Sequence, residues 1–309
     1  MASTQSISAD FPFQENYVEV HGSKIHYVEA GSGDPVLFLY GQPTSSYLWR
    51  NVIPHVSPVA RAIAMDNIGF GKTDKPDIEY RFVDHVKYVE GFIEALGLKN
   101  VTLVIHDWGS ALGFHYAMRN ESNVKGIAFM EALLMPIPSY DSIPTESKEM
   151  FQAFRTPDVG WDMIVNQNMF IEQLVPQMVG RKLTDAEMDA IREPFTDPAT
   201  RLPLWRWPNE LPIGGEPADV HDIVSAYAAK LQESDLPKLL IHGDPGVIIP
   251  PPIGEMCKQS YKNLKTVDIG LGLHYLMENN PHLIGEEIAA WYRSTFTRPN
   301  IASADLPNA

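Results

Sequence analysis

Short apolar runs recur along the chain, and segments with a helical spacing of apolar residues separate several of them. The runs are rich in Val, Ile and Leu, which is typical of parallel strands that are buried on both faces of a sheet. They occupy residues 35–40, 61–66, 101–106, 126–131, 238–243 and 264–270. Residues 17–31 alternate and turn at His21–Gly22, which predicts an opening β-hairpin. Residues 83–97 have a helical period and end at a glycine suited to a helix C-cap. The order of these segments predicts an α/β fold, a mostly parallel twisted sheet with helices on both faces.

The alternation of strands and helices stops after Glu131. From about Leu134 to Ile213 the chain is rich in Met, Phe, Trp and Pro, with helical segments but no clear buried strand. Alternation resumes at residue 236. We therefore expect a core domain of residues 1–133 and 214–309, with a helical cap of residues 134–213 inserted into it. An insertion over the carboxyl ends of the strands can shape a ligand site.

The segment VIHDWGSALGFHYA, which begins at Val104, has the form of a nucleophile elbow. Such an elbow is a sharp strand-to-helix turn that usually carries Ser in G-x-S-x-G, and here Asp107 takes the central position. An Asp at this place could instead simply cap the helix. A carboxylate that attacks saturated carbon forms an ester, which water can cleave, whereas a serine would leave an ether. Asp107 is therefore predicted to be a nucleophile that attacks an alkyl carbon.

A histidine and two carboxylates follow other predicted strands. His274 comes after the last strand, where a hydrolase of this chain order has its general base. Its expected role is to deprotonate the water that cleaves the ester. Asp244 and Glu131 both end strands and could orient His274, and spacing alone favours Asp244. Because the carboxyl ends of parallel strands meet at one edge of the sheet, all these residues could lie together.

Two uncharged donors complete the candidate set. Trp108 follows the nucleophile directly, and Gln42 follows the strand at residues 35–40. Indole and amide N–H groups can bind a leaving anion without the charge of a lysine or arginine. The backbone N–H groups of the same two residues occupy oxyanion-hole positions. Core packing for Trp108 and turn stabilisation for Gln42 are the simpler alternatives.

Composition narrows the class of protein. The formal net charge of −15 argues against nucleic-acid binding, which needs clustered Lys and Arg. No apolar run approaches the length of a membrane span, and the amino terminus lacks the pattern of a signal peptide. The sequence therefore favours a cytoplasmic protein.

Cys257 is the one cysteine, so an internal disulfide is excluded; we expect an unreactive thiol rather than an intermolecular disulfide.

The motifs together resemble the haloalkane dehalogenases of the α/β-hydrolase superfamily. The similarity extends over almost the whole chain and includes GQPTSSYLWR, HDWG, FMEALLMPIP, LWRWPNELPIGGEPA and GDPGVIIPP. It implies Asp107 as nucleophile, His274 as base and Trp108 as halide donor. It also favours Glu131 over Asp244 as the acid, because the segment after Glu131 resembles the branch of the family with a Glu there.

The resemblance has further implications for the reaction and its pocket. The expected activity converts a small apolar haloalkane to an alcohol, a halide ion and a proton through an alkyl ester on Asp107, with no cofactor and no metal. The protein would be a monomer or a homodimer. The pocket or its tunnel would be lined by Phe151, Phe170, Trp207, Pro208, Val247 and Ile248, although an apolar cluster in a cap could equally be simple core.

The chain departs from the family pattern at two positions. The usual HGNPTSS is YGQPTSS here, with Tyr40 in place of His and Gln42 in place of Asn. Glutamine keeps the amide donor but is one methylene longer, so we expect Gln42 still to bind halide in a pocket of altered size. Tyr40 is expected to pack behind the loop, without a functional role.

Relatives with the same elbow leave alternatives open. Epoxide hydrolases also use an Asp nucleophile but need cap tyrosines, and the cap segment here has only Tyr140. Luciferases of the coelenterazine type, which are monooxygenases, share the HDWG and PTSSYLWR motifs. A non-enzymatic receptor with this fold is a third possibility, which the complete set of Asp107, His274 and a carboxylate disfavours.

Overall fold

The buried apolar runs form the strands of one eight-stranded sheet, with the order β1-β2-β4-β3-β5-β6-β7-β8. The computed structural model describes residues 6–297. The first hairpin pairs with the sheet antiparallel, and the strands from β4 to β8 are mutually parallel. The predicted strands and the predicted hairpin are thus confirmed. The strands are β1 (Glu15–Val20), β2 (Ser23–Ala30), β3 (Pro35–Leu39), β4 (Arg61–Met65), β5 (Val101–Asp107), β6 (Val124–Ala132), β7 (Lys238–Pro245) and β8 (Leu264–Gly272).

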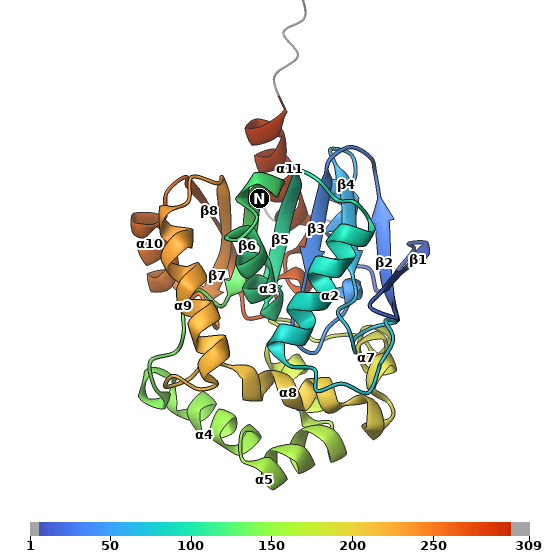
Figure 1. Ribbon diagram of the computed structural model, residues 1–309, viewed down its shortest axis with the longest axis vertical. Helices are drawn as coiled ribbons and strands as arrows, with labels where there is room; N and C mark the ends of the chain where they lie inside the picture. Colours follow the sequence, from blue (N-terminus) through green and yellow to red (C-terminus); the bar gives the residue numbers. More distant parts are fainter. Residues whose placement is uncertain (1–5, 298–309) are drawn as a thin grey trace, which may run out of the picture.

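Helices cover both faces of the sheet, as expected for strands whose residues are buried on both sides (Figure 1). Helices α2, α3 and α9 lie in front of the sheet in this view, and α11 lies behind it, packed against α1. Helix α10 packs against β8, the edge strand, and its neighbour β7. These helices are α1 (Ile53–Val56), α2 (Phe82–Ala95), α3 (Trp108–Ala117), α9 (Ala218–Glu233), α10 (Pro251–Ser260) and α11 (Pro281–Phe296).

A group of helices from the middle of the chain lies at one end of the sheet, below it in Figure 1. They come between β6 and α9, and their sequence contributes no strand to the described sheet. A parallel bridge between Ile137 and Ile213 joins the two ends of this segment. The domain boundaries expected from the sequence remain a prediction. The helices are α4 (Thr145–Phe154), α5 (Pro157–Trp161), α6 (Val175–Gln177), α7 (Asp185–Arg192) and α8 (Leu202–Glu210), with short π-helical segments η4 (Asp162–Asn166) and η5 (Phe170–Leu174).

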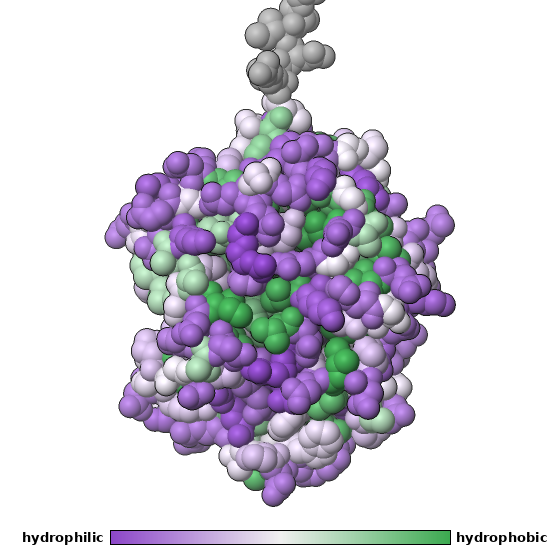
Figure 2. All heavy atoms as spheres, in the orientation of Figure 1, coloured by the Kyte–Doolittle hydropathy of each residue, from purple (hydrophilic) through white to green (hydrophobic). Residues whose placement is uncertain are grey.

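Polar side chains dominate one face of the molecule, and the cysteine is buried. Figure 2 shows a mostly hydrophilic face, with hydrophobic residues gathered in its middle between α9 and α2. No helix within residues 6–297 has both the length and the apolar composition needed to cross a membrane. Cys257 is fully buried, and burial raises the pKa of its thiol to about 11. A buried, protonated thiol is a poor candidate for an intermolecular disulfide.

A buried ion-pair cluster joins helix α7 to two turns close to the sheet. The Arg50 guanidinium follows the 3₁₀ turn η1 (Ser46–Trp49) and contacts Glu187 of α7 at 2.9 Å. It also binds Glu278 of η8 (Leu276–Glu278), with Nη1 2.6 Å from Oε1. All three side chains are at most 3% exposed. Arg181, whose side chain is 25% exposed, also pairs with both carboxylates. Removing Arg50 would still take away their fully buried cation, which is strongly unfavourable.

We predict that Arg50→Ala lowers the free energy of unfolding by about 3–5 kcal/mol. The matched control is Arg61→Ala, because the Arg61–Glu29 pair is about one third exposed. A pair of that kind contributes only about 0–1 kcal/mol. Urea unfolding followed by circular dichroism measures both variants. Equal, small effects of the two substitutions would contradict the structural role assigned to the buried cluster.

Candidate active site

Asp107 occupies a sharp turn between β5 and α3. Its backbone has φ 51° and ψ −131°, a conformation that non-glycine residues rarely adopt. Two neighbouring glycines make the turn possible: a Cβ on Gly41 would overlap the Asp107 carboxylate, and one on Gly109 would overlap the backbone of Leu39. The turn therefore has the strained geometry that an elbow requires, and it presents the carboxylate at the carboxyl edge of the sheet.

The Asp107 carboxylate is surrounded by donors. Oδ1 accepts a hydrogen bond of 2.8 Å from the backbone N–H of Gln42, and Oδ2 lies 3.5 Å from Nε2 of His274. Burial alone would raise the pKa of Asp107, but His274 and the backbone N–H of Trp108 hold it below its usual value. The group is therefore an anion at neutral pH, with 16% of its side chain exposed.

His274 lies between two carboxylates, in the loop that follows β8. Its Nδ1 is 3.1 Å from Oε2 of Glu131, while its Nε2 faces Asp107. Burial would lower the pKa of His274, but hydrogen bonds and charge from Asp107 and Glu131 raise it to about 9. His106 fixes the backbone here, since its Nε2 lies 3.0 Å from the His274 carbonyl oxygen. The structure thus places His274 in a row between the carboxylates of Asp107 and Glu131.

Glu131 is fully buried at the end of β6, and backbone groups satisfy its charge. Its two oxygens accept hydrogen bonds from three successive N–H groups, those of Val247, Ile248 and Ile249, at 2.7–3.2 Å. Burial would raise the pKa of Glu131, but His274 and these N–H groups lower it. Asp244, the alternative acid, is an exposed residue on β7, and His274 Nδ1 donates its hydrogen bond to Glu131 instead.

The two expected halide donors both contact helix α8. The Trp108 indole stacks on Trp207 of α8, with ring centroids 4.5 Å apart and planes inclined by 22°. Trp207 in turn stacks on His85 at 4.2 Å. The side-chain amide of Gln42 donates a hydrogen bond of 2.7 Å to the carbonyl of Leu204. One of the two amide hydrogens of Gln42 is therefore already engaged by helix α8.

The expected pocket residues come from three parts of the chain. Phe151 on α4 and Phe170 on η5 are half-buried, and Phe154, which sequence reasoning missed, packs between them with ring centroids 6.4 and 5.8 Å away. Trp207 and Pro208 are buried on α8. Val247 is 44% exposed and Ile248 is half-buried, next to the N–H groups that bind Glu131.

Tyr40 does more than pack behind the loop. It is fully buried, and its hydroxyl donates to Asp66 Oδ1 at 3.3 Å and accepts from the backbone N–H of Asn67 at 2.8 Å. The expectation of packing alone was therefore incomplete. The contact depends on β3 and β4 lying side by side, which a local motif does not reveal. Tyr275 was also missed; its hydroxyl donates to the Gln42 carbonyl at 2.8 Å.

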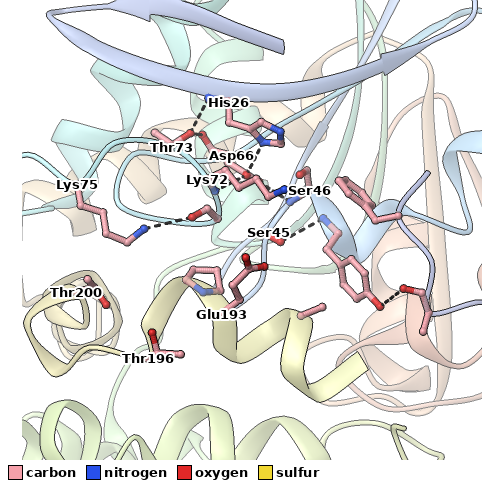
Figure 3. A pocket seen from close by; sticks show the side chains of 16 residues that line it. His26, Ser45, Ser46, Asp66, Lys72, Thr73, Lys75, Glu193, Thr196 and Thr200 are labelled. Carbon is pink, nitrogen blue, oxygen red and sulfur yellow. Dashed lines mark hydrogen bonds and ion pairs between the residues drawn. The ribbon is translucent and has the colours of Figure 1, made fainter. Parts of the chain in front are cut away.

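A polar cavity of about 560 Å³ lies away from Asp107, between the core and α7 with the turns that follow it (Figure 3). Asp66 lies at its base and binds His26 Nδ1 at 2.7 Å and the backbone N–H of Ser46 at 2.6 Å. Lys72, on its wall, is paired with Glu15. Asp107 is not among the residues that line this cavity. Within residues 6–297, no group of three or more His, Cys, Asp or Glu side chains is arranged to hold a metal ion.

Comparison with known proteins agrees with this geometry. Residues 34–281 match the family model of the alpha/beta hydrolase fold. A haloalkane dehalogenase from Mesorhizobium japonicum is 45% identical over 281 residues, which is 90% of this chain and 91% of that protein. One from Sphingobium indicum strain UT26S is 43% identical over 289 residues, covering 91% and 96% of the two chains.

Solved structures give the same relationship. The haloalkane dehalogenase DbeA from Bradyrhizobium elkani USDA94 superposes with a TM-score of 0.90 at 41% identity, covering 92% of this chain and 98% of its own. The putative ancestral haloalkane dehalogenase AncHLD2 superposes with a TM-score of 0.89 at 46% identity, covering 91% and 99%. The strained Asp107 turn, its histidine partner and these similarities over nine tenths of the chain lead to one conclusion: the chain belongs to the haloalkane dehalogenase family of α/β hydrolases.

Proposed function

We propose that this chain hydrolyses the carbon–halogen bond of small apolar haloalkanes, through a covalent alkyl ester on Asp107. The observation that carries the proposal is the position of the Asp107 carboxylate, between the Gln42 backbone N–H at 2.8 Å and His274 at 3.5 Å. A carboxylate held in this way can attack saturated carbon, and a base is in place to cleave the product of that attack.

The first step is displacement of halide by Asp107. Oδ1 is engaged by the Gln42 backbone N–H, so Oδ2 is the oxygen available for attack. The new Oδ2–carbon bond forms as the carbon–halogen bond breaks, and the electron pair leaves with the halide. Trp108 Nε1–H and the second amide hydrogen of Gln42 are the proposed donors to the departing ion. Because neither donor is charged, the halide can be released again afterwards.

The second step is hydrolysis of the ester by water and His274. Ester formation removes the negative charge of Asp107, one of the causes that raise the pKa of His274 to about 9 in the free enzyme. The pKa of His274 therefore falls in the intermediate, and the neutral imidazole can take a proton from water. The resulting hydroxide attacks the ester carbonyl, whose oxyanion is stabilised by the backbone N–H groups of Gln42 and Trp108. The acyl–oxygen bond breaks, the imidazolium of His274 gives its proton to the departing alkoxide, and the alcohol leaves. Asp107 is restored as a carboxylate when the second proton of the water is released.

Glu131 is the proposed acid of the row. Its carboxylate is fixed by three backbone N–H groups and stabilises the imidazolium that forms when His274 takes the proton. The cellular location, the oligomeric state and the charge of the substrate are proposed from the sequence. We propose a cytoplasmic enzyme that is a monomer or a homodimer and takes an uncharged halogenated substrate.

The covalent mechanism predicts a trapped intermediate. With 1-bromobutane, the wild type should release bromide repeatedly and Asp107→Ala should release none. His274→Ala should release about one bromide per molecule and then stop, with one butyl group bound, because the ester can form but has no base to cleave it. A bromide electrode and intact-protein mass spectrometry measure the two quantities. A folded His274→Ala protein with neither bromide release nor an adduct would sink the proposal. Epoxide opening and light emission with coelenterazine are then the next assays.

The identity of the acid can be read from the titration of His274. We predict a pKa of about 9 in the wild type. In Glu131→Gln the pKa should fall by about 1–3, because a neighbouring negative charge that favours the imidazolium is lost. Asp244→Asn is the matched control and should leave the pKa unchanged, since Asp244 is exposed. Histidine NMR titration gives all three values. The reverse pattern would identify Asp244 as the acid.

A further inference from the structure

Helix α8 contains a proline in its interior, and this changes the hydrogen bonding of one buried carbonyl. In an α-helix the carbonyl of residue i accepts from the N–H of residue i+4. For Leu204 that residue is Pro208, which has no N–H. Leu204 is fully buried, so its carbonyl needs another donor or loses free energy.

Gln42 supplies that donor from the opposite side of the site. Its Nε2 lies 2.7 Å from the Leu204 oxygen, in a bond that joins residues 162 positions apart in the chain. Gln42 itself is only 3% exposed. Its length matters here, because an asparagine with the same backbone is one methylene shorter and would fall short of the Leu204 carbonyl.

The rest of Gln42 is fixed to the catalytic centre. Its backbone N–H binds Asp107 Oδ1, and its carbonyl accepts from the Tyr275 hydroxyl at 2.8 Å. With the backbone held and one amide hydrogen engaged, the amide plane is fixed, and so is the direction of the second amide hydrogen. Helix α8 also carries Trp207, which stacks on Trp108. The same helix therefore contacts both residues that are proposed to bind halide.

We propose that the Gln42–Leu204 hydrogen bond joins the oxyanion loop to helix α8 and sets the orientation in which Gln42 meets the leaving halide. Gln42 is in this respect a positioning and specificity-determining residue. Pro208 makes the bond possible, because it offers the Leu204 carbonyl no N–H donor within the helix. The halide part of this inference rests on the proposed function; the link between loop and helix does not.

A double-mutant cycle of Gln42→Asn and Pro208→Ala tests the link. Gln42→Asn should raise the equilibrium constant for unfolding by roughly 5- to 100-fold, because the buried Leu204 carbonyl loses its donor. Pro208→Ala supplies an N–H within the helix, so Gln42→Asn should cost much less when it is combined with Pro208→Ala. Pro203→Ala, in the first turn of α8, is the matched control and should give no rescue. Urea unfolding without halide or substrate measures the cycle.

Halide binding provides the second measurement. Quenching of tryptophan fluorescence by bromide and chloride gives dissociation constants for each variant. We expect Gln42→Asn to weaken bromide binding roughly 2- to 10-fold and to change the ratio between the two ions, with or without Pro208→Ala. The Gln42→Asn variant should still convert haloalkanes.

The outcomes separate the two claims. Equal stability losses from Gln42→Asn with and without Pro208→Ala would overturn the link. Rescue of stability with unchanged halide affinities would overturn the orienting role. If the wild type releases no halide from any haloalkane, the proposed function fails, while the unfolding cycle still decides on the link.

Discussion

The whole site depends on holding one carboxylate in a backbone conformation that an aspartate does not favour. Asp107 has φ 51° because β5 and α3 are joined without an intervening loop residue. Such strain costs about 1–3 kcal/mol and persists only where surrounding packing fixes it. The packing comes from the neighbouring strand β3: Gly41 follows this strand, and Gly109 lies against the backbone of its last residue, Leu39. The parallel sheet thus determines the position of the Asp107 carboxylate.

The second constraint is that the charges of the site are buried, and hydrogen bonds from fixed positions stabilise them. Asp107 and Glu131 are two carboxylates on either side of one imidazole, which favours the imidazolium in the resting enzyme. The charge of Glu131 is stabilised without a mobile cation, because the backbone N–H groups of Val247–Ile249 donate hydrogen bonds to its carboxylate. The proposed chemistry uses this balance. When Asp107 becomes a neutral ester, His274 loses one of its two anions, its pKa falls, and the neutral imidazole can act as a base.

Much of the fold and of the candidate site could be predicted from the sequence, because both follow from local patterns. The apolar runs gave the strands, and the strand ends gave Asp107, His274 and the two candidate acids. Spacing alone favours Asp244, whereas the structure pairs His274 with Glu131. That contact depends on how the chain after β7 turns its N–H groups towards Glu131 at the end of β6. The contact of Tyr40 with Asp66 and that of Gln42 with Leu204 were equally out of reach. Each joins segments that only the tertiary structure brings together.

The origin of the oxygen in the alcohol tests the central claim most directly. A single turnover would be run in H₂¹⁸O, with the enzyme in excess over a bromoalkane. If the substrate is transferred to Asp107 and water attacks the ester carbonyl, the alcohol carries ¹⁶O from the carboxylate and ¹⁸O enters Asp107. Mass spectrometry of the alcohol and of the peptide that contains Asp107 gives both results. An alcohol labelled with ¹⁸O and an unlabelled Asp107 would show direct attack of water on the substrate and would contradict the account.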